Sequence, residues 1–181
     1  MKLLKNKTIA TLICFIMIIL GLFAGSLRCI NNEKAKARRY FSSASKSNPV
    51  PLTKDLEIKC GYAANLVTLY KKYSGDSKAD ALENSVKALK SSMNSPKKAY
   101  KYSAEISVDA VALRNAIDGL ALSDNDRGAY TRLKQELLSI DDIIARNGYN
   151  TVAGEANKRI NTLPIRFFKT IMLIGDVEYF K

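Results

Sequence analysis

The sequence predicts an all-α protein in which one N-terminal transmembrane helix is followed by an antiparallel bundle of long helices, and three observations lead to this prediction. Between Lys7 and Arg28 there are 20 consecutive uncharged residues. From Leu52 to Leu163, apolar residues recur at alternating intervals of three and four, the spacing that aligns one face of a helix. Pro96 is the one proline inside that range, so little else interrupts helical structure.

The apolar run at positions 8–27 is long enough, at about 30 Å, to cross the hydrocarbon core of a bilayer. Residues 1–7 form a basic N-terminus. A cleaved signal peptide is the alternative, because Ala24-Gly25-Ser26 resembles a cleavage site, but the length of the run favours retention. We therefore expect a single-pass protein of the cell membrane. The side on which the bundle lies stays open: the more basic C-terminal flank favours an outside N-terminus, and the signal-like start favours the opposite.

Residues 28–51 are predicted to be a basic juxtamembrane segment and a linker, because this stretch is first basic and then rich in serine, with Pro49 and Pro51 at its end. A basic stretch beside a membrane attracts anionic headgroups by about 1 kcal/mol per charge. Simple topological anchoring is the alternative role.

The helical bundle is predicted over residues 52–164, with short loops between amphipathic segments. Ser77 opens the second segment in the manner of a capping box, with aspartate three residues later in place of Glu or Gln. Ser95 and Pro96 suit the start of the third. Asn147 and Gly148 suit a C-cap or kink after the fourth, since both tolerate positive φ. The predicted buried stripes are Leu56, Cys60, Ala63, Val67 and Tyr70; Leu82, Val86, Leu89 and Met93; Ala99, Ile106, Ala110, Leu113, Ile117 and Leu120; and Tyr130, Leu133, Leu137, Ile140 and Ile144.

The stretch YNTVAGEANKRINTLP, at positions 149–164, predicts a short amphipathic helix that ends before Pro164. Its apolar face consists of Tyr149, Val152, Ala156, Ile160 and Leu163. Two asparagines, Asn150 and Asn157, are seven residues apart and so lie near one face. We expect their amides to hydrogen-bond to a neighbouring helix and fix its register; solvent exposure or local capping is the alternative.

The order of residues in this stretch resembles the signature of the LemA family of bacterial membrane-anchored helical proteins. An earlier segment, KDLEIKCGYAANLVTLYKKY, is similar to the first helix of that family through Asn65-Leu66-Val67, although Lys59-Cys60-Gly61 and alanines replace the family's usual arginine pair and proline. The resemblance implies a long-helix bundle on one membrane span, without an established catalytic activity or cofactor. The matching signature residues are Arg146, Tyr149, Asn150, Val152, Asn157, Ile160 and Pro164.

Several classes of activity are disfavoured by composition. The chain contains no histidine, so it cannot supply a Ser-His-Asp or Cys-His site by itself. Its three cysteines lack the spacing of a zinc site or of a disulfide framework. Asp141 and Asp142 point about 100° apart on a helix and cannot converge on one atom. We therefore expect no enzyme activity, no catalytic residue, no metal, no cofactor and no small-molecule substrate.

The leading functional hypothesis is a non-enzymatic scaffold or protein-interaction module at the bacterial cell membrane. The apolar C-terminal tail, residues 165–181, needs a cover, which is either a protein partner or the chain's own bundle. The alternative is an extracytoplasmic binder of anionic lipid or wall polymer, because the formal net charge is +12 and lysines cluster at positions 97, 98 and 101. Nucleic acid is not expected, since no recognition motif is present, and the oligomeric state stays open. The predicted partner contacts are Phe167, Phe168, Tyr179 and Phe180.

Overall fold

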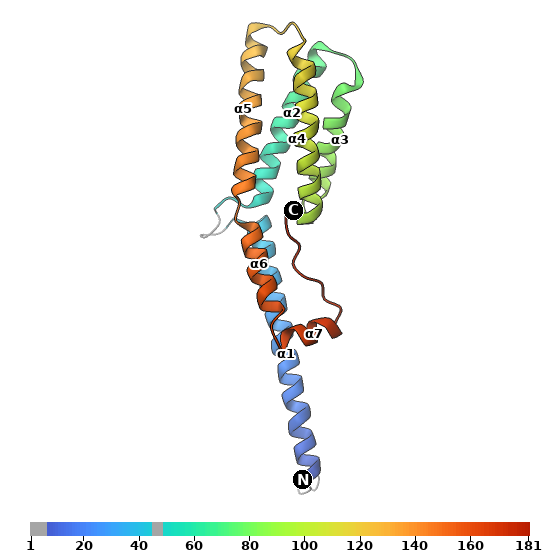
Figure 1. The fold of residues 1–181 in the computed structure, drawn as a ribbon, viewed down its shortest axis with the longest axis vertical. Coiled ribbons are helices and arrows are strands. Elements are labelled where there is room, and N and C mark those ends of the chain that lie inside the picture. Colours follow the sequence, from blue (N-terminus) through green and yellow to red (C-terminus); the bar gives the residue numbers. More distant parts are fainter. Residues whose placement is uncertain (1–6, 45–48) are drawn as a thin grey trace. The chain divides into compact units, whose positions relative to one another are not determined.

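The computed structural model describes residues 7–44 and 49–181 and confirms the all-α fold: a long apolar N-terminal helix is followed by packed helices, and these two ranges contain no strand. The elements, shown in Figure 1, are α1 (Lys7–Ser42), α2 (Leu52–Tyr73), the short 3-10 helix η2 (Ser77–Ala79), α3 (Asp80–Ser91), α4 (Pro96–Asp118), α5 (Asp124–Arg146), α6 (Tyr149–Ile160) and α7 (Ile165–Ile171).

The chain divides into two compact units. The bundle unit comprises Arg38–Thr151 and Glu178–Lys181, and the anchor unit comprises Met1–Ala37 and Val152–Val177. This division differs from the predicted segments, because residues 152–164, predicted as the last part of the bundle, group with the N-terminal helix. A helix face that is apolar by spacing does not reveal which neighbour covers it, so the sequence alone does not place this segment.

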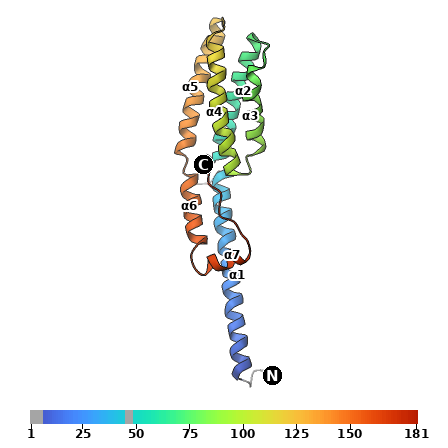
Figure 2. The ribbon, with the colours of Figure 1, turned by 45° about the vertical axis from the view of Figure 1, so that its right-hand side comes forward.

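The bundle unit is built around α2, which packs against α3, α4 and α5. Helices α3 and α5 lie at opposite edges, with α2 and α4 between them in both views (Figures 1 and 2). The predicted stripes are buried in this unit except for Met93, Leu120 and Leu133, which are half-buried. Each fully buried aliphatic side chain contributes about 1.5–3 kcal/mol, so these stripes are the main source of the unit's stability.

Two helix starts test the capping predictions. Helix α4 begins at Pro96 as expected, but the Ser95 hydroxyl donates to Glu178 Oε2 (2.7 Å) instead of capping the helix. The capping role predicted for Ser77 was wrong, because Asp76 precedes η2 and its carboxylate accepts from the Lys78 backbone N–H (3.1 Å). Because aspartate caps a helix as well as serine does, the sequence does not show which of these two adjacent residues takes the capping position.

At the junction after α5, the backbone passes close to the Tyr40 side chain and does not form a left-handed turn. Asn147 ends the helix with φ −62°, and no described glycine has a positive φ, so that part of the prediction was wrong. A Cβ on Gly148 would lie 2.8 Å from the Tyr40 hydroxyl oxygen, so a larger residue here would require the Tyr40 side chain to shift. The Asn147 side-chain oxygen accepts from the backbone N–H of Tyr149 (3.0 Å) and so helps to start α6.

The anchor unit contains most of α1, which is the helix long and apolar enough, by length and composition, to cross a membrane; a signal sequence passes the same test. Its large apolar side chains from Leu12 to Leu22 are 41–67% exposed. The helix continues to Ser42, through much of the stretch predicted as a linker, because residues 33–39 are mostly strong helix formers. Within the unit, Ile30 is fully buried, and Glu33 pairs with Arg159 of α6 (2.9 Å).

Candidate functional site

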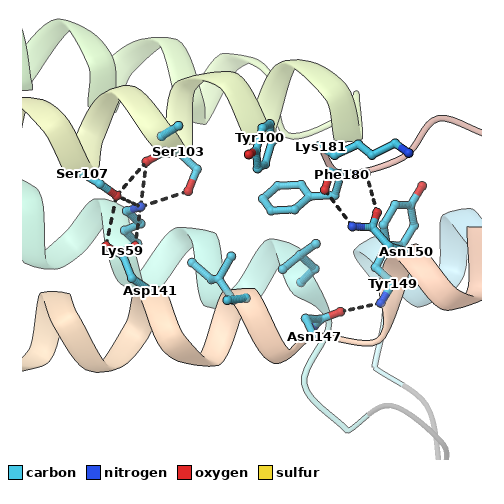
Figure 3. A pocket seen from close by; sticks show the side chains of 14 residues that line it. Lys59, Tyr100, Ser103, Ser107, Asp141, Asn147, Tyr149, Asn150, Phe180 and Lys181 are labelled. Atoms are coloured by element: carbon cyan, nitrogen blue, oxygen red, sulfur yellow. Dashed lines mark hydrogen bonds and ion pairs between the residues drawn. The ribbon is translucent and has the colours of Figure 1, made fainter.

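A groove of about 490 Å³ runs between α4 and α5 of the bundle unit, with α2 at its base (Figure 3). It exists because α4 and α5 both pack against α2 and make little contact with each other. We call it the α4–α5 groove. The residues that line it are Leu52, Lys59, Tyr100, Ser103, Ala104, Ser107, Asp141, Ile144, Ala145, Asn147, Tyr149, Asn150, Phe180 and Lys181.

One end of the groove holds a buried ammonium group, that of Lys59, which is 2% exposed. Its Nζ donates to the backbone oxygen of Ser103 (2.7 Å) and to the hydroxyls of Ser103 (3.0 Å) and Ser107 (2.7 Å), and it pairs with Asp141 Oδ1 (2.5 Å). Ser107 in turn donates to Asp141 Oδ2 (3.0 Å). These contacts, marked in Figure 3, join α2 to both walls of the groove.

Burial lowers the pKa of Lys59, and the hydrogen bond and charge of Asp141 oppose that effect. A buried lysine with a lowered pKa is typical of functional sites. Here, however, an ammonium with three N–H groups meets four oxygen atoms, so no donor is left for a ligand. The arrangement therefore connects the three helices and does not present a free amine.

The other end of the groove is closed by the C-terminal tail. The side chain of Asn150 donates from Nδ2 to the backbone oxygen of Phe180 (2.9 Å) and accepts, at Oδ1, from the backbone N–H of the same residue (2.8 Å). Tyr149 donates from its hydroxyl to the backbone oxygen of Glu178 (2.7 Å), and burial raises the pKa of this tyrosine. The Phe180 ring packs edge to face on Tyr100 at 5.3 Å.

The same two-bond arrangement occurs in the anchor unit, where Asn157 donates to the backbone oxygen of Val177 (3.0 Å) and accepts from its N–H (2.8 Å). We call each pair an asparagine clamp. The predicted partner, a neighbouring helix, was wrong: both amides bind the backbone of the C-terminal tail, which has no regular secondary structure there. An amide side chain carries the same donor and acceptor as a peptide group, so it can pair with the N–H and the C=O of one tail residue as another backbone segment would.

The other signature residues have different surroundings. Arg146 is exposed and pairs with Asp142 on its own helix, so it is not part of the groove. Val152 is half-buried and Ile160 is fully buried in the anchor unit, and Pro164 is exposed. Leu163 is 81% exposed, so its predicted place on the apolar face was wrong; α6 ends at Ile160, before the helical spacing reaches it.

Of the four side chains predicted to contact a partner, two are buried, one is half-buried and one is exposed. Phe180 is 8% exposed in the bundle unit, and Phe168 is 8% exposed in the anchor unit, so the chain's own fold covers both. Tyr179 is half-buried, whereas Phe167 is 58% exposed. Of the four, Phe167 presents most of its ring to a partner.

A lysine patch lies on α4, where a shallow hollow of about 730 Å³ is lined by four lysines, two carboxylates and three other residues: Lys97, Lys98, Lys101, Lys181, Glu105, Asp109, Tyr100, Ala104 and Val108. Lys101 pairs with Glu105 (3.8 Å), so Lys97, Lys98 and Lys181 supply most of its uncompensated charge. Lys181 was missed from the sequence, because it follows the other lysines by about 80 residues. The asparagine clamp at Asn150 brings the tail, and with it Lys181, to this patch.

The described part of the chain contains no group of three or more Cys, Asp or Glu side chains that could hold a metal ion. Asp141 and Asp142 bind different partners, Lys59 and Arg146, as their angular separation requires. Cys60 is buried, and burial raises the pKa of its thiol to about 11.

Family models, curated proteins and solved structures were each searched with this chain, and none of the three searches found a match. The resemblance to the LemA family therefore stays a prediction made from the residues of positions 146–164 and 54–73.

Proposed function

We propose that the chain is a non-enzymatic, LemA-like helical bundle anchored in the bacterial cell membrane by α1, where it serves as a scaffold or protein-interaction module. One observation carries the proposal. The apolar side chains of α1 from Leu12 to Leu22 have no described protein cover, whereas the bundle unit covers its own stripes. A surface of this length and composition needs lipid around it.

Retention of α1 is supported by its structure near the alternative cleavage site. Residues 24–26 are helical, and helical structure continues to Ser42. Ser26 and Ile30 are 3% and 0% exposed, so this part of α1 contributes to the core of the anchor unit. Removal of the first 26 residues would cut into that core, which favours an anchor over a signal sequence.

The scaffold role is supported by the surface of α4. The α4–α5 groove opens beside Tyr100, and the same helix exposes Val108 and Val111, which are 69% and 45% exposed. Apolar side chains gathered on one exposed helix, next to an open groove, are typical of a surface that binds protein. The groove is the contact region that we propose.

Anchoring is tested by fractionation of cells that express the full chain. We expect the intact chain, with its N-terminal residues detected by mass spectrometry, in the membrane fraction after washing with high salt and alkaline carbonate. Release by either wash, or a mature chain that begins after Ser26, would overturn the anchoring proposal.

The contact region is tested by placing a photoreactive amino acid at Ala104, which lines the groove, and at Ala145 on the opposite wall. Asn84, exposed on α3, is the matched control position. The proposal expects crosslinked protein adducts from both groove positions and none from the control. Equal adducts at all three positions, or adducts at none, would contradict it.

The second candidate, an extracytoplasmic binder of anionic lipid or wall polymer, is favoured by the lysine patch. The test is binding of polyphosphate to the full chain in detergent at increasing salt. A binder should lose affinity steeply with salt, and Lys97→Glu combined with Lys98→Glu should abolish binding. Arg132→Glu combined with Lys134→Glu, both exposed on α5, is the charge-matched control, and equal losses in the two double variants would reject the patch as the site.

A further inference from the structure

A second apolar surface lies in the anchor unit, on the outer side of α7 and the turns that flank it. Leu163, Phe167, Ile171 and Leu173 are 81%, 58%, 60% and 91% exposed. Phe167 and Ile171 are four residues apart and so share one helix face. We call these four residues the α7 apolar face. Nothing described in the chain covers it.

The inner side of α7 is fully occupied. Phe168 is 8% exposed, and its ring packs on Phe23 of α1 with the ring centres 5.6 Å apart. Lys169 is 8% exposed and binds Asn161 Oδ1 (2.6 Å) and the carboxylate of Asp176. With both groups held inside the unit, α7 has a fixed orientation in it, and the apolar residues on its outer side cannot turn inward.

The contact with Phe23 fixes the level of α7 along α1. Phe23 is four residues, or about 6 Å at helical rise, before the apolar run ends at Leu27. Arg28, the next residue, is charged and exposed. The helix α7 therefore lies where the surface of α1 changes from apolar to charged, which is the level of the headgroups if α1 spans a bilayer.

The turn after α7 presents a leucine where glycine is usual. The backbone N–H of Ile174 donates to Lys169 O and that of Leu173 donates to Thr170 O, both at 3.1 Å, which is the Schellman pattern of a helix C-terminus. Leu173 is at the left-handed position of this motif, with φ 54°, a conformation that costs free energy for a residue with a side chain. Its side chain gains no compensating contact from the described protein.

We propose that the α7 apolar face inserts into the boundary between headgroups and acyl chains of the same bilayer that α1 crosses, next to the span. Apolar side chains on a short segment at this level are typical of interfacial insertion. Arg28 and Arg166 are exposed at this level, where their guanidinium groups can bind lipid phosphates. This inference rests on the proposed membrane anchoring, and its test separates the two.

The chain contains no tryptophan, so a single introduced indole reports its surroundings without background. The full-length Phe167→Trp chain is reconstituted into vesicles of phosphatidylethanolamine and phosphatidylglycerol, with or without bromine on the upper acyl chain. We expect blue-shifted emission that brominated lipid quenches almost completely. Leu138→Trp, exposed on α5 of the bundle unit, is the matched control and should emit as in water, without quenching.

The outcomes distinguish the two proposals. If the chain does not float with the vesicles, anchoring fails and this inference fails with it. If it floats but the indole at position 167 behaves like the control, the inference alone is overturned. Blue-shifted emission that lipid does not quench would mean that protein, such as a second copy, covers the face, and this result also overturns it. Ile171→Trp repeats the measurement in case the first variant does not fold.

Discussion

The bundle unit and the anchor unit are both built from helices rich in apolar residues. In the bundle unit most of these residues are covered by protein, whereas in the anchor unit many of them are exposed. Each helix of the bundle unit packs its apolar stripe inside the unit, and most of its exposed residues are polar or charged, with exceptions such as Val108 on α4 and Leu138 on α5. In the anchor unit α1 is apolar around its whole circumference from Leu12 to Leu22, and no packing of α6 and α7 could cover it. The contrast shows that periodicity predicts a helix, whereas the composition of the opposite face determines which solvent that helix requires.

The two units also share a way of holding polar groups inside. Each has one buried lysine tied to an aspartate, Lys59 with Asp141 and Lys169 with Asp176, and each has one asparagine clamp. Every buried side-chain nitrogen and oxygen atom in the described residues has a hydrogen-bond partner. The units therefore differ in their apolar surfaces and not in how well their polar groups are satisfied.

The largest effect that separates the two units should come from removing a core leucine. Leu113→Ala in α4, where the side chain is 1% exposed, should lower the free energy of unfolding of the bundle by about 3 kcal/mol. Leu20→Ala in α1, where it is 58% exposed, should leave that transition unchanged. Denaturant unfolding followed by circular dichroism in detergent measures both, and an equal loss in the two variants would contradict the comparison.

Alkaline pH should weaken the bundle unit through Cys60. Its pKa is raised from 9.0 to about 11 by burial, so the folded state keeps the thiol proton after the unfolded chain has lost it. This contribution is fully present below pH 9 and is lost as pH rises to about 11, and it amounts to about 3 kcal/mol at most. We expect the fall in unfolding free energy over this window to be smaller in Cys60→Ala. Identical pH dependence in the two proteins would exclude this cause.

Replacing an asparagine of a clamp should matter more in the anchor unit. Asn157 is 8% exposed, whereas Asn150 is largely exposed. Asn157→Leu leaves a buried N–H and C=O of Val177 unpaired at a cost of about 2 kcal/mol, and Asn150→Leu should cost less. Hydrogen exchange at the amides of Val177 and Phe180 measures the release of the tail. Faster exchange after the Asn150 change than after the Asn157 change would reverse the expected order.

The smallest effect should be a gain in stability. Leu173→Gly relieves the left-handed backbone and should stabilise the turn after α7 by about 1 kcal/mol in detergent, seen as slower exchange of the Ile174 amide. Thr170→Gly, in the last turn of α7 and without positive φ, should instead destabilise the helix end. Faster exchange of the Ile174 amide in Leu173→Gly would contradict this prediction. It would mean that contact between the Leu173 side chain and the detergent stabilises the turn.

The sequence predicted the bundle well because its stripes depend on local spacing. It missed the burial of Lys59, although this residue falls on the apolar stripe between Leu56 and Ala63, because three of its four acceptor contacts come from α4 and the fourth comes from α5. It also missed the partner of the asparagines. The tail is separated from α6 by a turn, α7 and a second turn, and no local pattern predicts where a chain returns after three changes of direction.

The asparagine clamps bind the peptide groups of the tail and make no demand on its side chains. Hydrogen bonds to backbone N–H and C=O form with almost any amino acid at that place, proline excepted. In natural variants of this protein the tail residues other than Val177 and Phe180, whose side chains are buried, can therefore change while the clamps keep their hydrogen bonds, whereas exchange of either asparagine would remove one clamp. A single pair of amides, seven positions apart, is what such variants would have to preserve.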